Sequence, residues 1–428
     1  MSELNGTEAR TPLRPFTTAS NSSGDIKVYF NQSTNPDFSN GTFPAASSFD
    51  DTEDAIKARI DAAEETVDVM MYNTSRDWLV DALEDAVDRG VRVRYIADDQ
   101  TTNSALSGSI DFPVLEGNDG NALMHNKVFI IDAASVDNSY LIMGSMNMTY
   151  NNVITDPNNT VFVQDQAIAK AYTWEFNEMW GGDTELPNLT LSRFGDQKTH
   201  NTPIYFNVAG TPVELYFAPT DPTSDAILEN LASADEEVIL GLLLLTQNRI
   251  GDLLVDLHDA GIRIRGLIEN IDDPGSEFFY LQNEGVNLQA HNVQTQFHHK
   301  YAIVDPDELD SDPLVITGSY NWTNAAENRN DENTLVIHDA DIANQFVQEF
   351  EERWGEATST QELVQPSIHW SVFPNPSSGF FQFNKEGNPF DGLAIVFDAQ
   401  GRLMQSIRLN NVESWTLDAQ GWEPGLYY

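Results

Sequence analysis

The stretch His125-Asn-Lys-Val-Phe-Ile-Ile-Asp132 has a second copy in the chain, His298-His-Lys-Tyr-Ala-Ile-Val-Asp305. Both copies have the form H-x-K-x4-D, and the apolar residues before each aspartate are typical of a buried strand. Side chains at positions i and i+2 of a strand point to the same face, so each leading histidine shares a face with its lysine. His299 falls on the opposite face, and we interpret it as a structural neighbour.

The sequence around each copy repeats as well. Glycine follows a predicted helix at Gly90 and again at Gly261, where it suits a left-handed C-cap before a strand. The order helix, strand, helix, strand is predicted at 55–60, 65–72, 78–89 and 91–96, and again at 226–231, 237–245, 250–260 and 262–268. This alternation predicts an α/β fold with a mixed or largely parallel sheet in each half. We expect the two halves to pack about a pseudo-twofold axis.

Composition shifts suggest where the parts of the chain begin and end. Both repeats close alike, with Phe176-Asn-Glu-Met-Trp180 and Phe350-Glu-Glu-Arg-Trp354. The predicted divisions are a polar N-terminal tail at 1–25, repeat 1 at 26–180, a Pro- and Gly-rich connector at 181–212, repeat 2 at 213–355 and a small β-rich domain at 356–428. The sequence stops inside an apparent last strand, so we expect this final domain to be truncated.

The overall composition narrows the function classes. The chain has 428 residues, no cysteine and a formal net charge of −45. Without cysteine there is no disulfide, thiolate metal site or cysteine nucleophile. The acid excess works against a stable nucleic-acid partner and suits a solvated surface in a salty medium. Calcium binding by the acidic loop 305–312 ranks below simple solvation, because its carboxylates lack the spacing of a calcium hand. We expect no transmembrane segment, and no signal peptide is visible.

A second motif follows each histidine motif at nearly the same distance, as Gly144-Ser-Met-Asn147 and Gly318-Ser-Tyr-Asn321. Glycine allows close backbone approach, and serine and asparagine at i and i+2 supply hydrogen bonds to one spot. If the repeats converge, they bring together two histidines and two lysines with the four groups that we expect to bind a substrate phosphate: Ser145, Asn147, Ser319 and Asn321.

That set of side chains suits cleavage of a phosphodiester. One neutral imidazole can attack phosphorus, and one protonated imidazole can give the leaving oxygen a proton. The lysines supply positive charge, so we predict that the chemistry needs no metal and no cofactor. The remaining histidines that we interpret as surface or core residues are His258, His291, His338 and His369.

H-x-K-x4-D followed by G-S-x-N, twice in one chain, resembles the signature of the phospholipase D superfamily. The stretch from Ile316 to Glu327, with Asp331-Glu-Asn333, is similar to the bacterial endonuclease and mitochondrial cardiolipin hydrolase branch. The resemblance implies two α/β/α sandwich repeats and a phosphohistidine intermediate on His125, with His298 as general acid.

The resemblance also implies roles for the residues around the histidines. Lys127, Lys300, Asn147 and Asn321 would bind the phosphate, and Asp132 and Asp305 would be supporting residues. In this family an acid after the G-S-x-N motif holds a histidine ring. Glu332 fits that position in repeat 2, whereas repeat 1 has Asn158. We expect each of the two to serve the histidine of its own half.

Three functions remain open from the sequence. The first is a phospholipase D-type hydrolase acting on phospholipids, the second a metal-independent secreted nuclease, and the third a non-catalytic adhesion or scaffold protein. One chain carries both half-sites, so a monomer would suffice. The last sixty or so residues resemble the sorting domains of the type IX secretion route of Bacteroidota. They imply a secreted or cell-surface protein that meets the secretion machinery through this domain.

Overall fold

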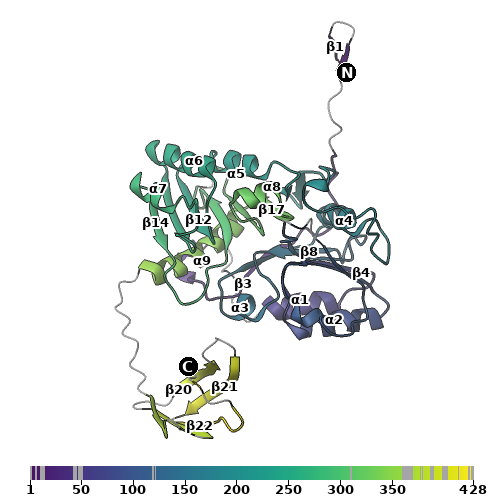
Figure 1. Ribbon diagram of the computed structural model, residues 1–428. Helices are drawn as coiled ribbons and strands as arrows, with labels where there is room; N and C mark the ends of the chain where they lie inside the picture. The colour runs from purple at the N-terminus through teal and green to yellow at the C-terminus, as the bar shows by residue number, and fades with distance from the viewer. Residues whose placement is uncertain are drawn as a thin grey trace. The chain divides into compact units, whose positions relative to one another are not determined.

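The chain forms two compact units, Met1–Thr358 and Ser359–Tyr428, in the computed structural model (Figure 1). The structure describes residues 15–41, 46, 52–117, 120, 122–308 and 311–358, with short stretches of 2–9 and parts of 370–425.

Repeat 1 is built on a seven-stranded mixed sheet with the order β3-β9-β8-β7-β4-β5-β6. Strands β4, β5 and β6 run parallel, and β7, β8 and β9 add to them in antiparallel fashion. In chain order its elements are β3 (Ile26–Phe30), α1 (Thr52–Asp61), β4 (Thr66–Met71), α2 (Asp77–Asp88), β5 (Arg92–Ala97), β6 (Val114–Glu116), β7 (Lys127–Ile131), β8 (Tyr140–Gly144), α3 (Tyr150–Ile154), β9 (Asn159–Val163) and α4 (Gln166–Trp180).

Repeat 2 has the same strand order with one strand added at the edge, β10-β11-β17-β16-β15-β12-β13-β14. Its elements are β10 (Tyr205–Val208), β11 (Thr211–Ala218), α5 (Thr223–Leu231), β12 (Glu237–Leu242), α6 (Asn248–Asp259), β13 (Arg263–Ile268), α7 (Phe278–Asn283), β14 (Asn287–Ala290), β15 (Lys300–Val304), β16 (Leu314–Gly318), α8 (Asn324–Asn328), β17 (Glu332–Ile337) and α9 (Ala340–Thr358). The predicted α/β fold and its internal repeat are confirmed.

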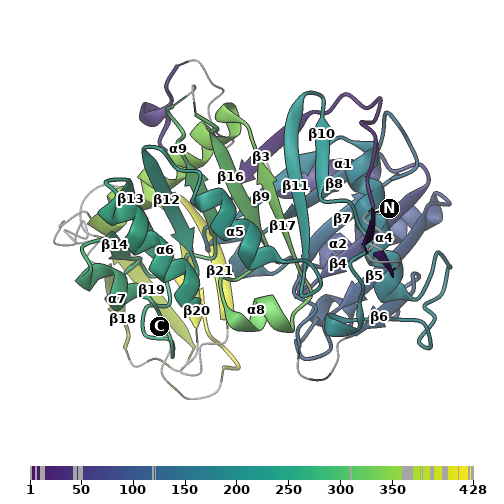
Figure 2. The ribbon, with the colours of Figure 1, turned by 90° about the horizontal axis from the view of Figure 1, so that it is seen from above.

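The two sheets lie on either side of a shared core, with α4 and α9 contributing to it and the other helices outside (Figures 1 and 2). On β7, Val128 and Ile130 face this shared core, whereas Phe129 and Ile131 pack in the outer cluster with α1 and α2. Strand β15 divides its side chains in the same way. Because both faces of each central strand are buried, the strands read as continuous apolar runs.

The predicted connector at 181–212 ends too late. Strand β10 and the first residues of β11 lie within that range, and they pair antiparallel as a hairpin on the edge of the second sheet. Ala209 and Gly210 have positive φ and form the turn of this hairpin. In the sequence these turn residues look like part of a loop, which is why the hairpin falls within the predicted connector. The true connector is therefore shorter and runs from Gly181 to about Ile204.

The C-terminal unit holds β18 (Trp370–Phe373), β19 (Phe380–Lys385), β20 (Phe390–Phe397), β21 (Leu403–Val412) and β22 (Ser414–Asp418). They form a three-stranded sheet, β18-β19-β22, and a β20-β21 pair, which agrees with the predicted β-rich domain. No helix in the described part of the chain is long and apolar enough to cross a membrane.

Candidate active site

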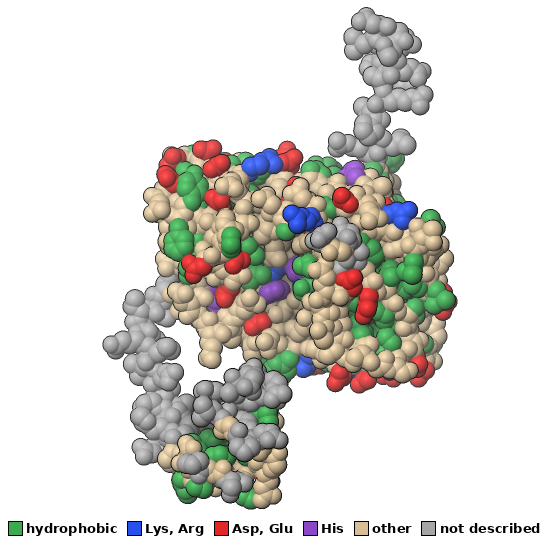
Figure 3. Space-filling view, in the orientation of Figure 1, with side chains coloured by type: hydrophobic (Ala, Val, Ile, Leu, Met, Phe, Trp, Pro, Cys, Tyr) green, Lys and Arg blue, Asp and Glu red, His purple; other side chains and the backbone are tan. Residues whose placement is uncertain are grey.

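The two histidine motifs meet where the repeats face each other. His125 and His298 stand two residues before the first residues of β7 and β15, which are the motif lysines. The backbone N–H of His125 donates to the carbonyl of Asp331 at 2.9 Å, and that of His298 donates to the carbonyl of Pro157 at 3.0 Å. Each histidine is thus anchored to the main chain of the other repeat. Figure 3 shows histidine side chains near the middle of the face that is turned toward the viewer.

The rings are also held across the repeat boundary. His125 Nδ1 lies 2.8 Å from Glu332 Oε2, and His298 Nδ1 lies 2.9 Å from Asn158 Oδ1. The expectation that Glu332 and Asn158 each serve their own half is therefore wrong. Asn158 directly precedes β9 and Glu332 begins β17, and from these strand starts each side chain reaches a histidine of the opposite repeat.

Hydrogen bonds around Asn158 fix the tautomer of His298. The amide nitrogen of Asn158 donates to the carbonyls of Asn152 and Asp156, so its oxygen must be the atom that faces the ring. An amide oxygen only accepts, and His298 therefore donates from Nδ1. Glu332 imposes the same tautomer on His125. In both rings Nε2 is left as the nitrogen available for chemistry.

The two lysines are buried beside the rings, and we call the cluster of His125, Lys127, His298, Lys300 and Glu332 the pocket. Lys127 Nζ donates to the carbonyl of His125 at 2.6 Å, and Lys300 Nζ donates to that of His298 at 2.7 Å. Burial lowers the pKa of Lys127 to about 7 against the opposing effect of Glu332, and it lowers the pKa of Lys300 well below its usual range.

The same environment acts on the other titratable groups. Burial, and then both lysines, hold the pKa of each imidazole well below its usual value, and His125 further lowers the pKa of His298. Burial raises the pKa of Glu332 to about 7, with Lys127 opposing. The pocket without substrate therefore favours neutral groups, and a bound phosphate anion would draw protons into it.

The motif serines point to the groups that hold the rings. Ser145 Oγ donates to Asn158 Oδ1 at 2.9 Å, and Ser319 Oγ donates to Glu332 Oε2 at 2.7 Å. Each hydroxyl also accepts a backbone N–H, from residue 159 or 333. These bonds use the donor of each hydroxyl, and the expected phosphate contacts of Ser145 and Ser319 stay a prediction.

Glycine before each serine is a steric requirement. A Cβ at Gly144 would lie 2.2 Å from the carbonyl oxygen of Asn159, and one at Gly318 would lie 2.2 Å from that of Asn333. Strand β8 can therefore approach β9 closely enough for the serine to reach its partner.

The motif asparagines differ from each other. Asn147 Nδ2 donates to Asn152 Oδ1 at 2.8 Å, and no such bond is found for Asn321 among the described residues. In both, the buried side-chain oxygen has no hydrogen-bond partner among the described residues. These unpartnered atoms are acceptors, so the two side chains would bind phosphate oxygens only through their amide N–H groups.

The motif aspartates lie at the far ends of β7 and β15. Asp132 accepts the backbone N–H groups of Glu64, Glu65 and Thr66 at 2.7–2.9 Å. Asp305 accepts those of residues 235, 236 and 237 at 2.7–2.9 Å. Both aspartates thus fix the turn that enters β4 or β12, and neither carboxylate takes part in the pocket.

The other histidines are placed as the sequence suggested, where the structure describes them. His299 is buried in the shared core, and its Nε2 lies 3.0 Å from Glu349 of α9. His291 is buried and bonded to Glu269, His338 is bonded to Asp312, and His258 is half-buried on α6. His369 lies outside the described residues. Among the described residues, no three His, Asp or Glu side chains gather in a way that could hold a metal ion.

A buried ion cluster behind the pocket escaped the sequence analysis. Lys198, from the connector, binds Glu175 of α4, Asp331 Oδ1 at 2.9 Å and the carbonyl of Ala218 at 3.1 Å. All three charged side chains are at most 1% exposed. Asp331 is the residue whose carbonyl holds His125, so this cluster braces one half of the pocket. A single lysine in a polar connector carries no pattern that would reveal it.

The two histidine rings, each held by a side chain of the other repeat, lie with two lysines in one buried pocket. This arrangement defines the class of two-repeat proteins that act on phosphodiesters. The chain belongs to the phospholipase D-like family, since the family described as "Cardiolipin synthase, PLD-like domain" matches residues 56–180 and 227–354. A second family, "Secretion system C-terminal sorting domain", matches residues 371–428 and indicates type IX secretion to the cell surface or the exterior.

Individual relatives agree with this family. The mitochondrial cardiolipin hydrolase of Mus musculus is 32% identical over 164 residues, covering 38% of this chain and 70% of that protein. That of Chlamydomonas reinhardtii is 30% identical over 136 residues, covering 31% of this chain, and the match spans just over half (58%) of the algal protein. The structure of Haemophilus influenzae phosphatidylserine synthase covers 79% of this chain and 88% of its own, with a TM-score of 0.52 at 11% identity, and supports the fold alone.

Proposed function

We propose that this protein is a metal-independent hydrolase that cleaves phosphodiesters through a phosphohistidine intermediate. The observation that carries the proposal is the pair of crossed Nδ1 contacts, His125 to Glu332 and His298 to Asn158. With Nδ1 so engaged, Nε2 of each ring is the nitrogen left for chemistry, and both rings are buried close enough to Lys127 and Lys300 for the lysines to lower their pKa values. Attack and proton donation can then occur on opposite sides of one phosphorus atom.

The two different ring partners assign the roles. When Nε2 of a histidine bonds to phosphorus, the ring becomes cationic, and a carboxylate at Nδ1 stabilises that charge. This favours His125, with Glu332, as the nucleophile. An amide partner gives no such stabilisation, so the imidazolium of His298 is the stronger acid and suits the leaving group. This assignment agrees with the roles that the resemblance to the phospholipase D superfamily implies for His125 and His298.

The proposed reaction has two steps. Nε2 of His125 bonds to phosphorus as the bond to the leaving oxygen breaks, and His298 gives that oxygen its proton. Neutral His298 then takes a proton from water, whose oxygen displaces His125 from phosphorus. Lys127, Lys300, Asn147 and Asn321 hold the phosphate oxygens, while Ser145 and Ser319 fix the partners of the two rings.

We propose a phospholipid as the substrate, with phosphatidate and a free headgroup as products. Support comes from the cardiolipin hydrolase names of the relatives and from the net charge of −45, which disfavours a nucleic-acid polyanion. Both half-sites lie on one chain, so a monomer suffices.

The test compares phosphatidylcholine micelles with single-stranded DNA, both in EDTA, for the unaltered chain and for His125→Ala. For the unaltered chain we expect headgroup release with EDTA present and a phosphoadduct trapped on His125. For His125→Ala we expect no headgroup release. Faster cleavage of DNA would favour the secreted nuclease instead. An adduct on His298 would reverse the roles, and no difference between the two chains in any phosphodiesterase assay would favour an adhesion or scaffold protein.

A further inference from the structure

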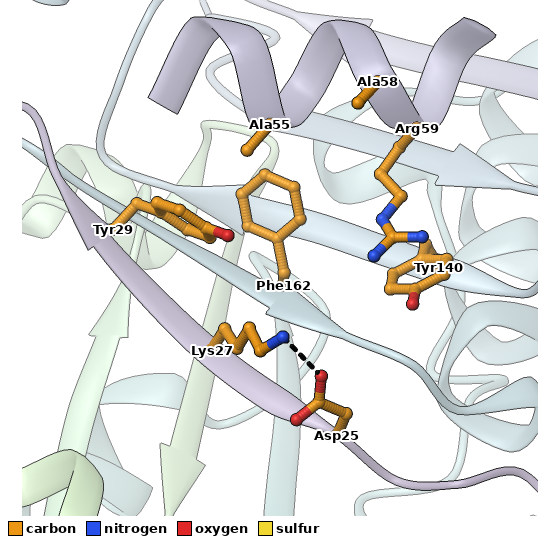
Figure 4. Close-up of a pocket in the computed structure, with 8 residues that line it drawn as sticks. All are labelled: Asp25, Lys27, Tyr29, Ala55, Ala58, Arg59, Tyr140 and Phe162. Carbon is orange, nitrogen blue, oxygen red and sulfur yellow. Dashed lines mark ion pairs between the residues drawn. The ribbon is translucent and has the colours of Figure 1, made fainter. Parts of the chain in front are cut away.

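A hollow of about 300 Å³ opens on the outer side of repeat 1, between α1 and the β3 edge of the sheet (Figure 4). Its wall residues come from four separate elements. The ones that matter for its chemistry are Lys27, Tyr29, Ala58, Arg59, Tyr140 and Phe162.

Small side chains on the helix create the space. Ala55 and Ala58 lie one turn apart on α1 and face the sheet edge, where a longer side chain would fill the gap. Below them, the Tyr29 and Phe162 rings meet at 4.8 Å between centroids and form an aromatic floor. The planes of the two rings are tilted by 58° to each other, so the hollow has an angled apolar base with room above it, and a ligand ring would pack against one of the two.

The rim of the hollow is cationic. The guanidinium of Arg59 lies 3.9 Å above the centroid of the Tyr140 ring, and no carboxylate among the described residues pairs with it. Lys27 Nζ lies 3.0 Å from Asp25, and both of those side chains are about half exposed. Two cations against one acid leave a local excess of positive charge on a chain that carries −45 overall. Arg59 stacked on a ring is pre-oriented, and its N–H groups make no hydrogen bond to the residues that the structure describes.

We propose that this hollow is a second binding site, for small anions that carry a flat apolar group, such as aryl phosphates or aromatic carboxylates. The ring of the ligand packs on Tyr29 or Phe162, and its anion accepts hydrogen bonds from Arg59 and Lys27. The volume suits a ligand of this size, and the apolar floor with few polar groups is typical of small-molecule sites.

The hollow is separate from the catalytic pocket. Lys27 pairs with Phe162 of β9. Asn159, which lies next to the pocket, is three residues earlier on the same strand, so Phe162 and Asn159 are roughly 10 Å apart at about 3.3 Å per residue. Tyr140 is likewise the first residue of β8, whereas Gly144, beside the pocket, is the last. The site is therefore independent of the proposed hydrolysis.

Calorimetric titration of the full chain with phenyl phosphate tests the proposal, with inorganic phosphate and benzyl alcohol as the probes that lack one half of the ligand. We expect phenyl phosphate to bind more tightly than either. Arg59→Gln should weaken its binding roughly tenfold or more by removing charged donors, and Ala58→Leu should weaken it by filling the hollow. Lys57→Gln, on the same helix but ion-paired with Asp61, is the matched control and should bind normally.

None of these three changes should alter phosphodiesterase activity, so the test stands whether or not the proposed function does. Failure of the full chain to bind phenyl phosphate overturns the proposal. So does unchanged binding in both Arg59→Gln and Ala58→Leu, and so does binding that is lost instead in Lys127→Gln, which would place the ligand in the catalytic pocket.

Discussion

Replacing Lys198 by methionine should lower the free energy of unfolding more than the replacement of any other lysine outside the two motifs. The ammonium of Lys198 is fully buried between Glu175 and Asp331 and also donates to the carbonyl of Ala218. The two carboxylates reinforce its charge and raise its pKa despite burial, whereas burial raises the pKa of Glu175 to about 7. Methionine keeps the volume of the side chain but leaves two buried acids without a partner.

The expected cost follows from that geometry. Removing one member of a buried ion cluster leaves uncompensated charge and costs about 3–5 kcal/mol. For a unit of 358 residues the conversion is about 1.3 °C per kcal/mol, so the Tm should fall by roughly 4–7 °C. Activity should fall as well, mainly in kcat, because Asp331 positions the backbone of His125.

Thermal unfolding of Lys198→Met is best compared with Lys57→Met. Lys57 and Asp61 form an exposed pair on α1 at 2.8 Å, which contributes less than about 1 kcal/mol. Adding Glu175→Gln to Lys198→Met should restore part of the lost stability by removing one unpaired acid. Equal Tm values for Lys198→Met and Lys57→Met, or no recovery in the double variant, would refute this reasoning.

Glu332→Gln should lower kcat by about 10²- to 10⁴-fold, since the ring of His125 loses its carboxylate partner; a change under threefold in steady-state assays would remove Glu332 from the mechanism. Sulfate, as an analogue of the substrate phosphate, should inhibit the hydrolase, and it keeps its charge between pH 5 and 9. Inhibition by sulfate should weaken as pH rises through about 7, because Lys127, whose pKa is lowered to about 7, then becomes neutral. Lys127→Arg should reduce that weakening, because a guanidinium stays charged, while Glu332, whose pKa is also about 7, still ionises in the same range; an identical pH profile would contradict it. Asp132→Ala should cost about 3 kcal/mol in urea unfolding by orphaning three backbone N–H groups while kcat per folded molecule stays unchanged; a selective loss of kcat would make Asp132 part of the chemistry.

The fold was accessible from the sequence because its determinants are local and occur twice. Gly90 and Gly261 end equivalent helices, and the apolar runs after Lys127 and Lys300 form the central strands β7 and β15. The contacts that organise the pocket are of another kind. Glu332 reaches His125 from 207 residues away, and no periodicity within one repeat indicates whether a side chain turns to its own half or crosses to the other.

The crossing has a consequence for how the pocket assembles. A repeat folded alone would have its histidine and lysine on one strand end, but the acceptor for the ring and the carbonyl for the backbone N–H would both be missing, since each comes from the other repeat. A free imidazole on a strand end can rotate and be solvated, and it would lose both its fixed tautomer and its buried environment. The neutral, oriented rings therefore arise only from the packing of the two halves, and the connector residue Lys198 contributes directly to that packing through Glu175 of one repeat and Asp331 of the other.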